Sequence, residues 1–573
     1  MTQLRARPVP CLGNLPETLN PVLRRVYGAR GVLCADELDL GLDRLLQADT
    51  LLGVEEAVAL LHAALARDQC IVFVADFDAD GATSCAVGMR ALRAMGAQSV
   101  DYVVPDRFRH GYGLTPSIVE LVRARGAALL VTVDNGMSSL EGVAAARAAG
   151  LTVLITDHHL PGTTLPNANA IVNPNRPGDV FPSKALAGVG VIFYVMLALR
   201  RALRAAGWFT SRALPEPRLA DLLDLVALGT VADVVPLDAN NRRLVAQGLA
   251  RLRAGRGQPG VRALLEVAGR DPSRLLASDL GFAVGPRLNA AGRLSDMSRG
   301  IECLLSDDPV RCAAIARELD GLNQQRRVLE RQMQEDALEQ VLQDLPQTGE
   351  LPAALCLFDP DWHQGVIGVV AGRVKDRFHR PVIAFAVAGD DELKGSARSI
   401  PGVHIRDLLD TIAAGHPGLL TRFGGHAMAA GLSLPRAHLE AFRAALEAVA
   451  AAHIDPALLA PEILTDGSLR PDEISTELAH ALQAAGPWGQ AFPEPLFEGE
   501  FEIRSLRVVG EHHLRLSLGL EEKIFEAMAF NASDASWASE GQRIRAAYRV
   551  ALNHWRGRED LQLVLTHAES CGA

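Results

Sequence analysis

The stretch CIVFVADFDADG, residues 70–81, joins a short apolar run that is typical of a buried β-strand to three aspartates and a glycine. Further apolar runs follow along the chain, with patterns typical of helices near residues 83–95 and 140–149. These runs are AALLVTV at 127–133, LTVLIT at 151–156 and ANAIV at 168–172. Strands that alternate with helices predict a parallel sheet with helices on both faces. Sites form at the carboxyl ends of such strands, so the residues after each run are the first candidates for function.

Acidic and imidazole side chains follow three of these runs. They are Asp76, Asp78 and Asp80 after the first run, Asp134 after the second, and His158 and His159 after the third. A tight turn at Gly81 would let several carboxylates of the first group face one point. The same acidic motif occurs in solvated turns and calcium loops, and helix caps or turn acids would explain any one of the three motifs. Three such motifs in one sheet favour a metal site, and carboxylates with a neutral imidazole favour manganese or magnesium over zinc or calcium.

The rest of the chain contains regions of distinct character. Residues 185–268 are mainly helical in pattern and carry Asp233 in the segment LGTVADVVPL. Residues 308–345 place apolar residues between charges, with no proline after Pro309, which predicts one long amphipathic helix. A second α/β unit follows at 353–451, and alternating apolar residues at 496–567 predict a small antiparallel barrel. The expected fold class is α/β: a parallel-sheet domain, joined by a long helix to a smaller α/β domain and followed by a C-terminal OB-type β-barrel.

Length and composition narrow the class of protein. A chain of 573 residues is longer than the ~250–300 residues that one hydrophobic core serves, so it divides into domains. Its 68 acidic against 57 basic residues give a net charge of −11, which argues against coating nucleic acid through bulk positive charge but allows a local basic channel. Eight cysteines without a CxxC pair indicate a reducing compartment, and no apolar run approaches the ~18 residues of a membrane span. We therefore expect a cytoplasmic protein that does not enter a membrane.

Several motifs in their order along the chain resemble those of a known group of enzymes. DFDADG (76–81), VDNG (133–136), TDHH (156–159) and VADVV (231–235) resemble the DHH phosphoesterase superfamily. WHQGVIGVVAGR (362–373), KGSARS (394–399) and FGGHAMAAGL (423–432) resemble its DHHA1 substrate-binding domain. RFRHGYGL (107–114), GPRLNAAGRL (285–294) and the C-terminal barrel narrow the resemblance to the RecJ branch of single-strand-specific exonucleases.

The resemblance implies a centre with two divalent metal ions, Mn2+ or Mg2+. One ion would be held by Asp76, Asp78 and Asp134, and the other by Asp80, Asp134, His158 and Asp233. The bridging Asp134 and His159 would be the catalytic residues, with His159 contacting the scissile phosphate or assisting the leaving group. Superfamily members that hydrolyse pyrophosphate or cyclic dinucleotides carry a histidine at the position of Val74, and Asp76 is the obvious substitute here.

The resemblance also assigns substrate-binding residues and domains. The residues are Arg109, Tyr112, Arg287, Asn289, Arg293, Ser396, Arg398, Gly424, Gly425 and His426. Arginines suit phosphates and glycines allow close approach of the backbone, whereas Tyr112 either stacks on a base or belongs to a turn. The implied domains are an N-terminal extension (1–50), a DHH catalytic domain (51–305), a connecting helix (306–346), a DHHA1 substrate-binding domain (347–455) and an OB-fold nucleic-acid-binding domain (456–573).

By the same resemblance we expect a single-stranded-DNA-specific 5′→3′ exonuclease that releases 5′-mononucleotides by two-metal-ion hydrolysis in DNA recombination and repair. The implied partners are single-stranded DNA, a single-strand-binding protein and a RecQ-type helicase, and the implied oligomeric state is a monomer. One alternative is a DHH phosphodiesterase of short oligoribonucleotides or cyclic dinucleotides, and another is an inactive scaffold. The C-terminal barrel and Val74 argue against the first alternative, and the retention of every candidate ligand argues against the second.

Overall fold

The computed structural model describes residues 2–9, 12–107, 109–343, 351–389, 391–555 and 558–571. Its packing forms two compact units, each made of segments that are distant in sequence. One unit combines Met1–Arg5 with Leu322–Ile463, and the other combines Ala6–Gly321 with Leu464–Ala573. The expected domain boundary at 346/347 lies outside the described residues.

The unit that contains Ala6–Gly321 is built around the predicted parallel sheet. Its strand order is β3-β2-β4-β5-β6, and every neighbouring pair is parallel. The strands are β2 (Ile71–Ala75), β3 (Val100–Val103), β4 (Leu129–Val133), β5 (Thr152–Thr156) and β6 (Ala170–Val172). All residues of β2 and β4 are buried, as the continuous apolar runs predict for strands covered on both faces. The prediction of a doubly covered parallel sheet is confirmed.

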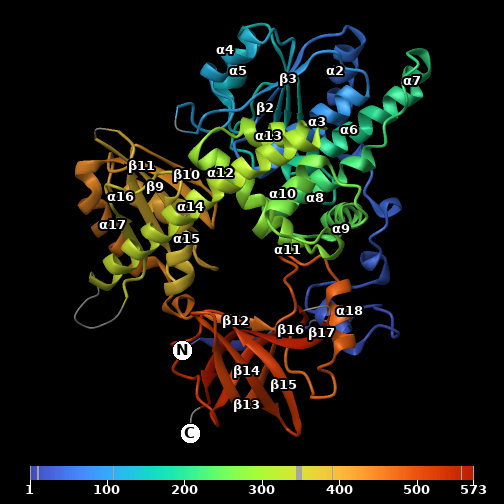
Figure 1. Cartoon of the computed structure of the whole chain (residues 1–573). Helices are drawn as coiled ribbons and strands as arrows, with labels where there is room; N and C mark the ends of the chain where they lie inside the picture. The colour runs from blue at the N-terminus through green and yellow to red at the C-terminus, as the bar shows by residue number, and fades with distance from the viewer. Residues whose placement is uncertain are drawn as a thin grey trace. The chain divides into compact units, whose positions relative to one another are not determined.

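Alternate side chains of β2 pack against different helices. Val72 and Val74 belong to an apolar cluster with residues of α4 (Pro116–Ala124) and α5 (Leu140–Ala148). Phe73 faces the opposite side, where its ring lies against Gly88 of α3 (Ala79–Ala94) and where α3 packs on α6 (Gly188–Ala205). Figure 1 shows the sheet between these two pairs of helices. The two-residue period of a strand therefore determines which helices cover each face.

The second half of the segment Ala6–Gly321 is helical. Its helices include α2 (Val54–Ala66), α7 (Trp208–Ser211), α8 (Leu223–Ala232), α9 (Ala239–Arg253), α10 (Pro259–Val267), α11 (Ala277–Asp279), α12 (Gly285–Leu294) and α13 (Ser298–Leu305). Apart from Asp224 and Thr230, helix α8 consists of apolar residues and glycine, and it packs among α3, α6 and α9. A π-helical turn, η6 (Leu280–Val284), joins α11 to α12 in one continuous segment.

The unit that contains Leu322–Ile463 holds most of the predicted long helix, α14 (Pro309–Gln343), and a mixed sheet. The strand order is β10-β11-β9-β8-β7, in which only β7 and β8 are parallel. The strands are β7 (Leu355–Phe358), β8 (Val382–Val387), β9 (Glu392–Arg398), β10 (Arg422–Gly425) and β11 (Ala429–Pro435), and the helices around them are α15 (Ile367–Phe378), α16 (Ile405–Gly415) and α17 (Leu439–His453). Phe385 and Phe442 meet edge to face, 5.4 Å apart, in its core.

The predicted C-terminal barrel is present as a closed, five-stranded structure of order β13-β14-β15-β17-β16. Its strands are β13 (Phe497–Val509), β14 (His513–Leu520), β15 (Lys523–Ala529), β16 (Arg543–Trp555) and β17 (Arg558–Ser570) (Figure 1). Antiparallel pairing of β13 with β16 and a short parallel pairing of β15 with β17 close the barrel, as in OB folds. Before it come β12 (Glu462–Thr465), which pairs with β1 (Gln3–Ala6), and α18 (Thr476–Ala484).

The N-terminal residues, the least marked part of the sequence, connect to the barrel segment through buried contacts. Arg30, just after α1 (Pro21–Gly28), forms a two-point ion pair with Asp466 at 2.7 and 3.0 Å, and both side chains are almost fully buried. Tyr27 packs on Trp488 and Phe492, and the guanidinium of Arg242 lies 4.1 Å from the Phe492 ring. The segment therefore stabilises the unit that it shares with the DHH motifs. Among the described residues, none of the helices combines the length and apolarity that crossing a bilayer requires.

Candidate metal centre

The carboxyl ends of β2, β4 and β5, together with the end of α8, bring imidazole and carboxylate groups together. The Nε2 atom of His158, after β5, lies 3.1 Å from Asp134 Oδ1, after β4, and 3.4 Å from Asp233 Oδ2, at the end of α8. It also lies 4.0 Å from Asp80 Oδ2. Ligand atoms of three groups lie within 4.8 Å of one another: Asp76 with Asp78 and Asp134, Asp80 with His158 and Asp233, and Asp134 with His158 and His159. The structure thus places all six residues expected to hold metals in one cluster.

The first acidic motif has a different local structure from the expected tight turn at Gly81. Helix α3 begins at Ala79, so Asp80 already lies in its first turn. Asp78 is the N-cap residue, and its carboxylate accepts a hydrogen bond from the backbone N–H of Gly81 at 3.0 Å. Capping satisfies an N–H group that the helix cannot pair, which favours helix over turn here.

Backbone groups hold the individual carboxylates in position. Asp80 accepts hydrogen bonds from the N–H groups of Gly188 and Val189, at 2.6 and 2.9 Å, at the start of α6. A Cβ atom at Gly188 would lie 2.7 Å from the Cβ of Asp134, so glycine allows α6 to begin beside the cluster. Asp134 itself has a positive φ of 61°, an uncommon conformation that turns the chain directly after β4.

The electrostatics of the cluster call for a cation. Burial raises the pKa of Asp80 to about 7, with a further rise from the charge of Asp78. Burial and neighbouring carboxylates also hold the pKa values of Asp76, Asp134 and Asp233 well above their usual range. Asp134 Oδ1 and Asp233 Oδ2 are buried and accept no hydrogen bond from any residue that the structure describes. Oxygen ligands with one imidazole nitrogen fit a manganese or magnesium ion, which would supply the missing positive charge.

A hydrogen-bond partner of His159 is Asp157, which is not one of the six clustered candidate ligands. Its Nδ1 atom lies 2.8 Å from Asp157 Oδ1, and the same carboxylate accepts backbone N–H groups of His158, His159 and Met137. Although burial opposes ionisation, these hydrogen bonds lower the pKa of Asp157. Burial likewise lowers the pKa of His159, but the hydrogen bond and charge of Asp157 outweigh it and raise that pKa. The imidazole is therefore oriented and favoured in its protonated form.

The aromatic rings of Tyr112 and Phe77 pack beside His159. The hydroxyl of Tyr112 donates to the backbone oxygen of Asp134 at 3.3 Å, and its ring meets Phe77 and His159 edge to face. The guanidinium of Arg107 lies 4.2 Å from the centre of the Phe77 ring. Burial lowers the pKa of Arg107, and the negative charges of Asp76 and Asp78 oppose that effect. Sequence reasoning selected Arg109 from the motif RFRHGYGL and missed Arg107. The motif itself does not distinguish the two arginines, because the contact of Arg107 with Phe77 depends on how the loop packs.

The predicted substrate-binding residues of this unit differ in their surroundings. Arg109 is 83% exposed and lies 3.8 Å from Asp106. Arg287 is largely buried, donates to the carbonyl of Ala283 and pairs with Asp320 at 2.7 Å. Asn289 accepts a hydrogen bond from the N–H of Ala79 at 2.8 Å, which ties α12 to the first acidic motif. Arg293 lies in the last turn of α12 and is half-buried.

The other unit arranges its predicted residues around a strip of bare backbone. Gly424 of β10, Gly431 of β11 and Ser396 of β9 form one row across three antiparallel strands, and a Cβ at either glycine would meet nothing within 4 Å. Arg398 donates to the hydroxyl of Ser396 at 3.0 Å, and Gly368 of α15 lies against both side chains. A hydroxyl, a guanidinium and a helix N-terminus beside exposed backbone suit a phosphate group.

Gly425 ends β10, and His426 begins the turn that joins β10 to β11. Gly425 has a φ of 143°, and a Cβ there would collide with the backbone of the following strand. The backbone N–H of His426 donates to the carbonyl of Ala429 at 2.8 Å. The side chain of His426 is exposed. The tight turn therefore presents His426 at the surface of this unit.

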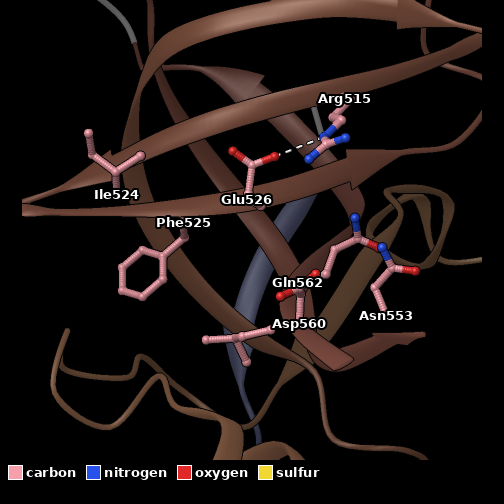
Figure 2. Close-up of a pocket in the computed structure, with 8 residues that line it drawn as sticks. Arg515, Ile524, Phe525, Glu526, Asn553, Asp560 and Gln562 are labelled. Carbon is pink, nitrogen blue, oxygen red and sulfur yellow. Dashed lines mark hydrogen bonds and ion pairs between the residues drawn. The ribbon is translucent and has the colours of Figure 1, made fainter. Parts of the chain in front are cut away.

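The barrel carries a surface hollow of about 400 Å³, shown in Figure 2. Its lining combines Ile524 and Phe525 with the amides of Asn553 and Gln562 and with acidic groups. Arg515 in this lining is bound to Glu526 at 2.8 Å. Residues 464–573 contain 17 acidic and ten basic residues, so the barrel segment as a whole is negatively charged. Its contribution to nucleic-acid binding therefore depends on local contacts and not on net charge.

Comparisons with known proteins agree with this division of motifs. Residues 70–230 match the model of the DHH family, N-terminal domain, residues 351–452 match the DHHA1 domain, and residues 465–567 match the RecJ OB domain. A curated protein of Escherichia coli (strain K12), "Single-stranded-DNA-specific exonuclease RecJ", is 52% identical over 567 residues, which cover 98% of this chain and 98% of that protein.

Two solved structures resemble the whole chain. A crystal structure of RecJ in complex with Mn2+ from Thermus thermophilus has a TM-score of 0.81 and 30% sequence identity, covering 100% of this chain and 80% of that one. The corresponding structure in complex with Mg2+ has a TM-score of 0.76 and 29% identity, covering 100% of this chain and 79% of that one. The likeness therefore extends over all parts of the fold.

Proposed function

This chain belongs to the RecJ family of single-stranded-DNA-specific exonucleases, and on that premise we propose that it digests single strands from the 5′ end and releases 5′-mononucleotides. It is a metal-dependent nuclease that acts on single-stranded DNA, with Mn2+ or Mg2+ as its cofactor. The observation that carries this function is the convergence of Asp80, Asp134 and Asp233 on the Nε2 atom of His158.

Two groups of residues would hold the ions. Asp76, Asp78 and Asp134 form one ligand set, and Asp80, Asp134, His158 and Asp233 form the other, with Asp134 common to both. Bound divalent ions supply charge neutralisation for the phosphodiester and ease the deprotonation of water near neutral pH. The buried oxygens of Asp134 and Asp233 that lack hydrogen-bond donors among the described residues support their assignment as ligands.

His159 is the candidate for proton transfer to the leaving oxygen. Asp157 accepts its Nδ1–H and favours the charged imidazolium, which keeps a proton available beside the cluster. Tyr112 and Phe77 pack against this region, and their rings limit the freedom of the imidazole. Such a residue lowers the barrier by protonating the oxygen as its bond to phosphorus breaks.

The remaining roles follow the domains expected from sequence. Arg109, Arg287, Asn289 and Arg293 would serve the strand end in the DHH domain (51–305), and Ser396, Arg398, Gly424, Gly425 and His426 would grip phosphates in the DHHA1 domain (347–455). The barrel domain (456–573) would add affinity for the strand. A cytoplasmic monomer that works with a single-strand-binding protein and a RecQ-type helicase in recombination and repair completes the proposal.

An end-labelled strand tests direction and catalysis together. We expect the purified protein with Mn2+ to release labelled mononucleotide at once from a 5′-labelled single strand and only late from a 3′-labelled one, and to leave a blunt duplex intact. Asp134→Asn should abolish this activity. Asp224→Asn should preserve it, because Asp224 is an equally buried carboxylate of the same unit at the opposite end of α8 from Asp233.

Three results would contradict the proposal. Early release from the 3′-labelled strand would reverse the direction. Turnover in Asp134→Asn close to that of the wild type at saturating Mn2+ would exclude Asp134 as a shared ligand. Hydrolysis confined to dinucleotides or cyclic dinucleotides would favour the alternative phosphodiesterase.

A further inference from the structure

Phe282 is the most exposed large apolar side chain among the residues that the structure describes, with 79% of its surface accessible. It lies in the π-helical turn η6, where its neighbours Leu280, Ala283 and Val284 are buried. Exposed aromatic surface contributes nothing to the core, so folding does not account for a phenylalanine here. The extra residue of a π-helical turn changes the direction of side chains, and such turns are frequent at functional sites.

The segment that carries Phe282 borders the metal centre along its length. A Cβ at Gly281 would lie 3.1 Å from Val231, and one at Gly285 would lie 3.2 Å from Ala232, so the turn packs on the two residues that precede Asp233. Farther along the same segment, Asn289 binds the backbone of Ala79 in the first acidic motif. Phe282 therefore lies next to the end of α8 that places Asp233 in the cluster.

A second exposed apolar residue lies at this end of α8. Val234 directly follows Asp233 and is 61% exposed. Its φ of 61° is strained for a β-branched residue, and such strain is typical of functional sites. The region beside Asp233 thus presents apolar surface to solvent at the edge of a cluster that is otherwise charged.

We propose that Phe282 is a stacking platform for a nucleobase of the strand that enters the metal centre. This subsite rests on the proposed function, because its ligand is the substrate strand. Every base offers a flat π-face, so one exposed ring binds single strands without selecting sequence. Arg293, in the last turn of α12, which continues from the same turn, would supply a cation for the phosphates of that strand. A duplex keeps its bases stacked on one another, so this contact favours single strands.

Substitutions at Phe282 separate stacking from other roles. We expect Phe282→Ala to raise the KM for a single strand roughly tenfold, the loss of about one base stack, with a smaller change in kcat. Phe282→Trp should restore the KM, whereas Phe282→Leu, which is apolar but lacks a π-face, should not. Val310→Ala is the matched control, since Val310 is 78% exposed at the start of α14 and should be silent.

Substrate variants identify the group that Phe282 contacts. On a strand made of abasic residues, wild type and Phe282→Ala should have the same KM, because no base remains to stack. In the Asp134→Asn background, which holds the strand uncut, binding should quench a 2-aminopurine base near the 5′ end, and adding Phe282→Ala should remove that quenching.

Specific results would overturn the stacking subsite. An unchanged KM in Phe282→Ala, full rescue by Phe282→Leu, or an equal loss on the abasic strand would each exclude base stacking. If the wild type failed to digest single strands at all, the proposed function would fall, while the 2-aminopurine measurement would still report on the base contact itself.

Discussion

The carboxylate cluster should make the metal-free protein less stable as pH rises, and Asp80 allows the size of this effect to be worked out. Burial raises the pKa of Asp80 to about 7, whereas an unfolded aspartate titrates near ~3.9. Between these values the folded state binds the proton more tightly, so the unfolding free energy falls as pH increases. A difference of about three pH units, at about 1.4 kcal/mol each, corresponds to about 4 kcal/mol.

The substitution Asp80→Asn removes this charge. Gly188 and Val189 donate to different oxygens of Asp80, so the amide loses one of these two hydrogen bonds, a cost that does not depend on pH. In a chelator, we therefore expect the stability of the wild type relative to the variant to fall by about 4 kcal/mol between pH 4 and pH 7.5. Urea unfolding followed by circular dichroism across this pH range measures the difference.

Manganese and a second buried acid provide the controls. Mn2+ at pH 7.5 should stabilise the wild type and should stabilise Asp80→Asn much less, because the variant lacks a ligand. Burial also raises the pKa of Asp224, to about 6, which predicts a similar loss of about 3 kcal/mol between pH 4 and 7.5 that Asp224→Asn removes. That loss should not respond to Mn2+, since Asp224 lies about 14 Å along α8 from Asp233.

Two results would refute this reasoning. If the stability difference between wild type and Asp80→Asn did not change with pH, burial would not be the cause of the raised pKa. If Mn2+ stabilised Asp80→Asn as much as the wild type, Asp80 would not be a ligand.

Three further predictions concern other contacts. Arg30→Met should lower the unfolding free energy by about 3–5 kcal/mol in urea titrations, because it leaves Asp466 buried and charged; a loss below about 1 kcal/mol would mean that solvent reaches the pair. Gly292→Ala should reduce exonuclease activity at least tenfold with an unchanged circular dichroism spectrum, since a Cβ would overlap the backbone of the first acidic motif, and wild-type activity would contradict that close approach. Asp157→Asn should move the basic limb of the pH–rate profile to lower pH, because burial alone lowers the pKa of His159; an unmoved limb would remove His159 as the proton donor.

Local sequence was sufficient for the parallel sheet and for the residue types of the metal centre. Buried parallel strands need continuous apolar runs, and their carboxyl ends meet at one edge, so the polar residues after each run could be grouped before any distance was known. The start of α3 was the local feature that pattern reading missed. The cap by Asp78 stabilises a helix where Gly81 suggested a turn.

The sequence by itself therefore determined the layers of the fold and the order of its domains, because periodicity and short motifs act over a few residues. The six candidate ligands came from the resemblance of its motifs to a known family. Tertiary structure alone decided which of two arginines lies near the acids, that Arg287 pairs with Asp320, and that Phe282 is left exposed beside α8. It also decided that Arg30 meets Asp466, 436 residues away, within one compact unit. Such contacts depend on how whole elements pack, and no local pattern carries that information.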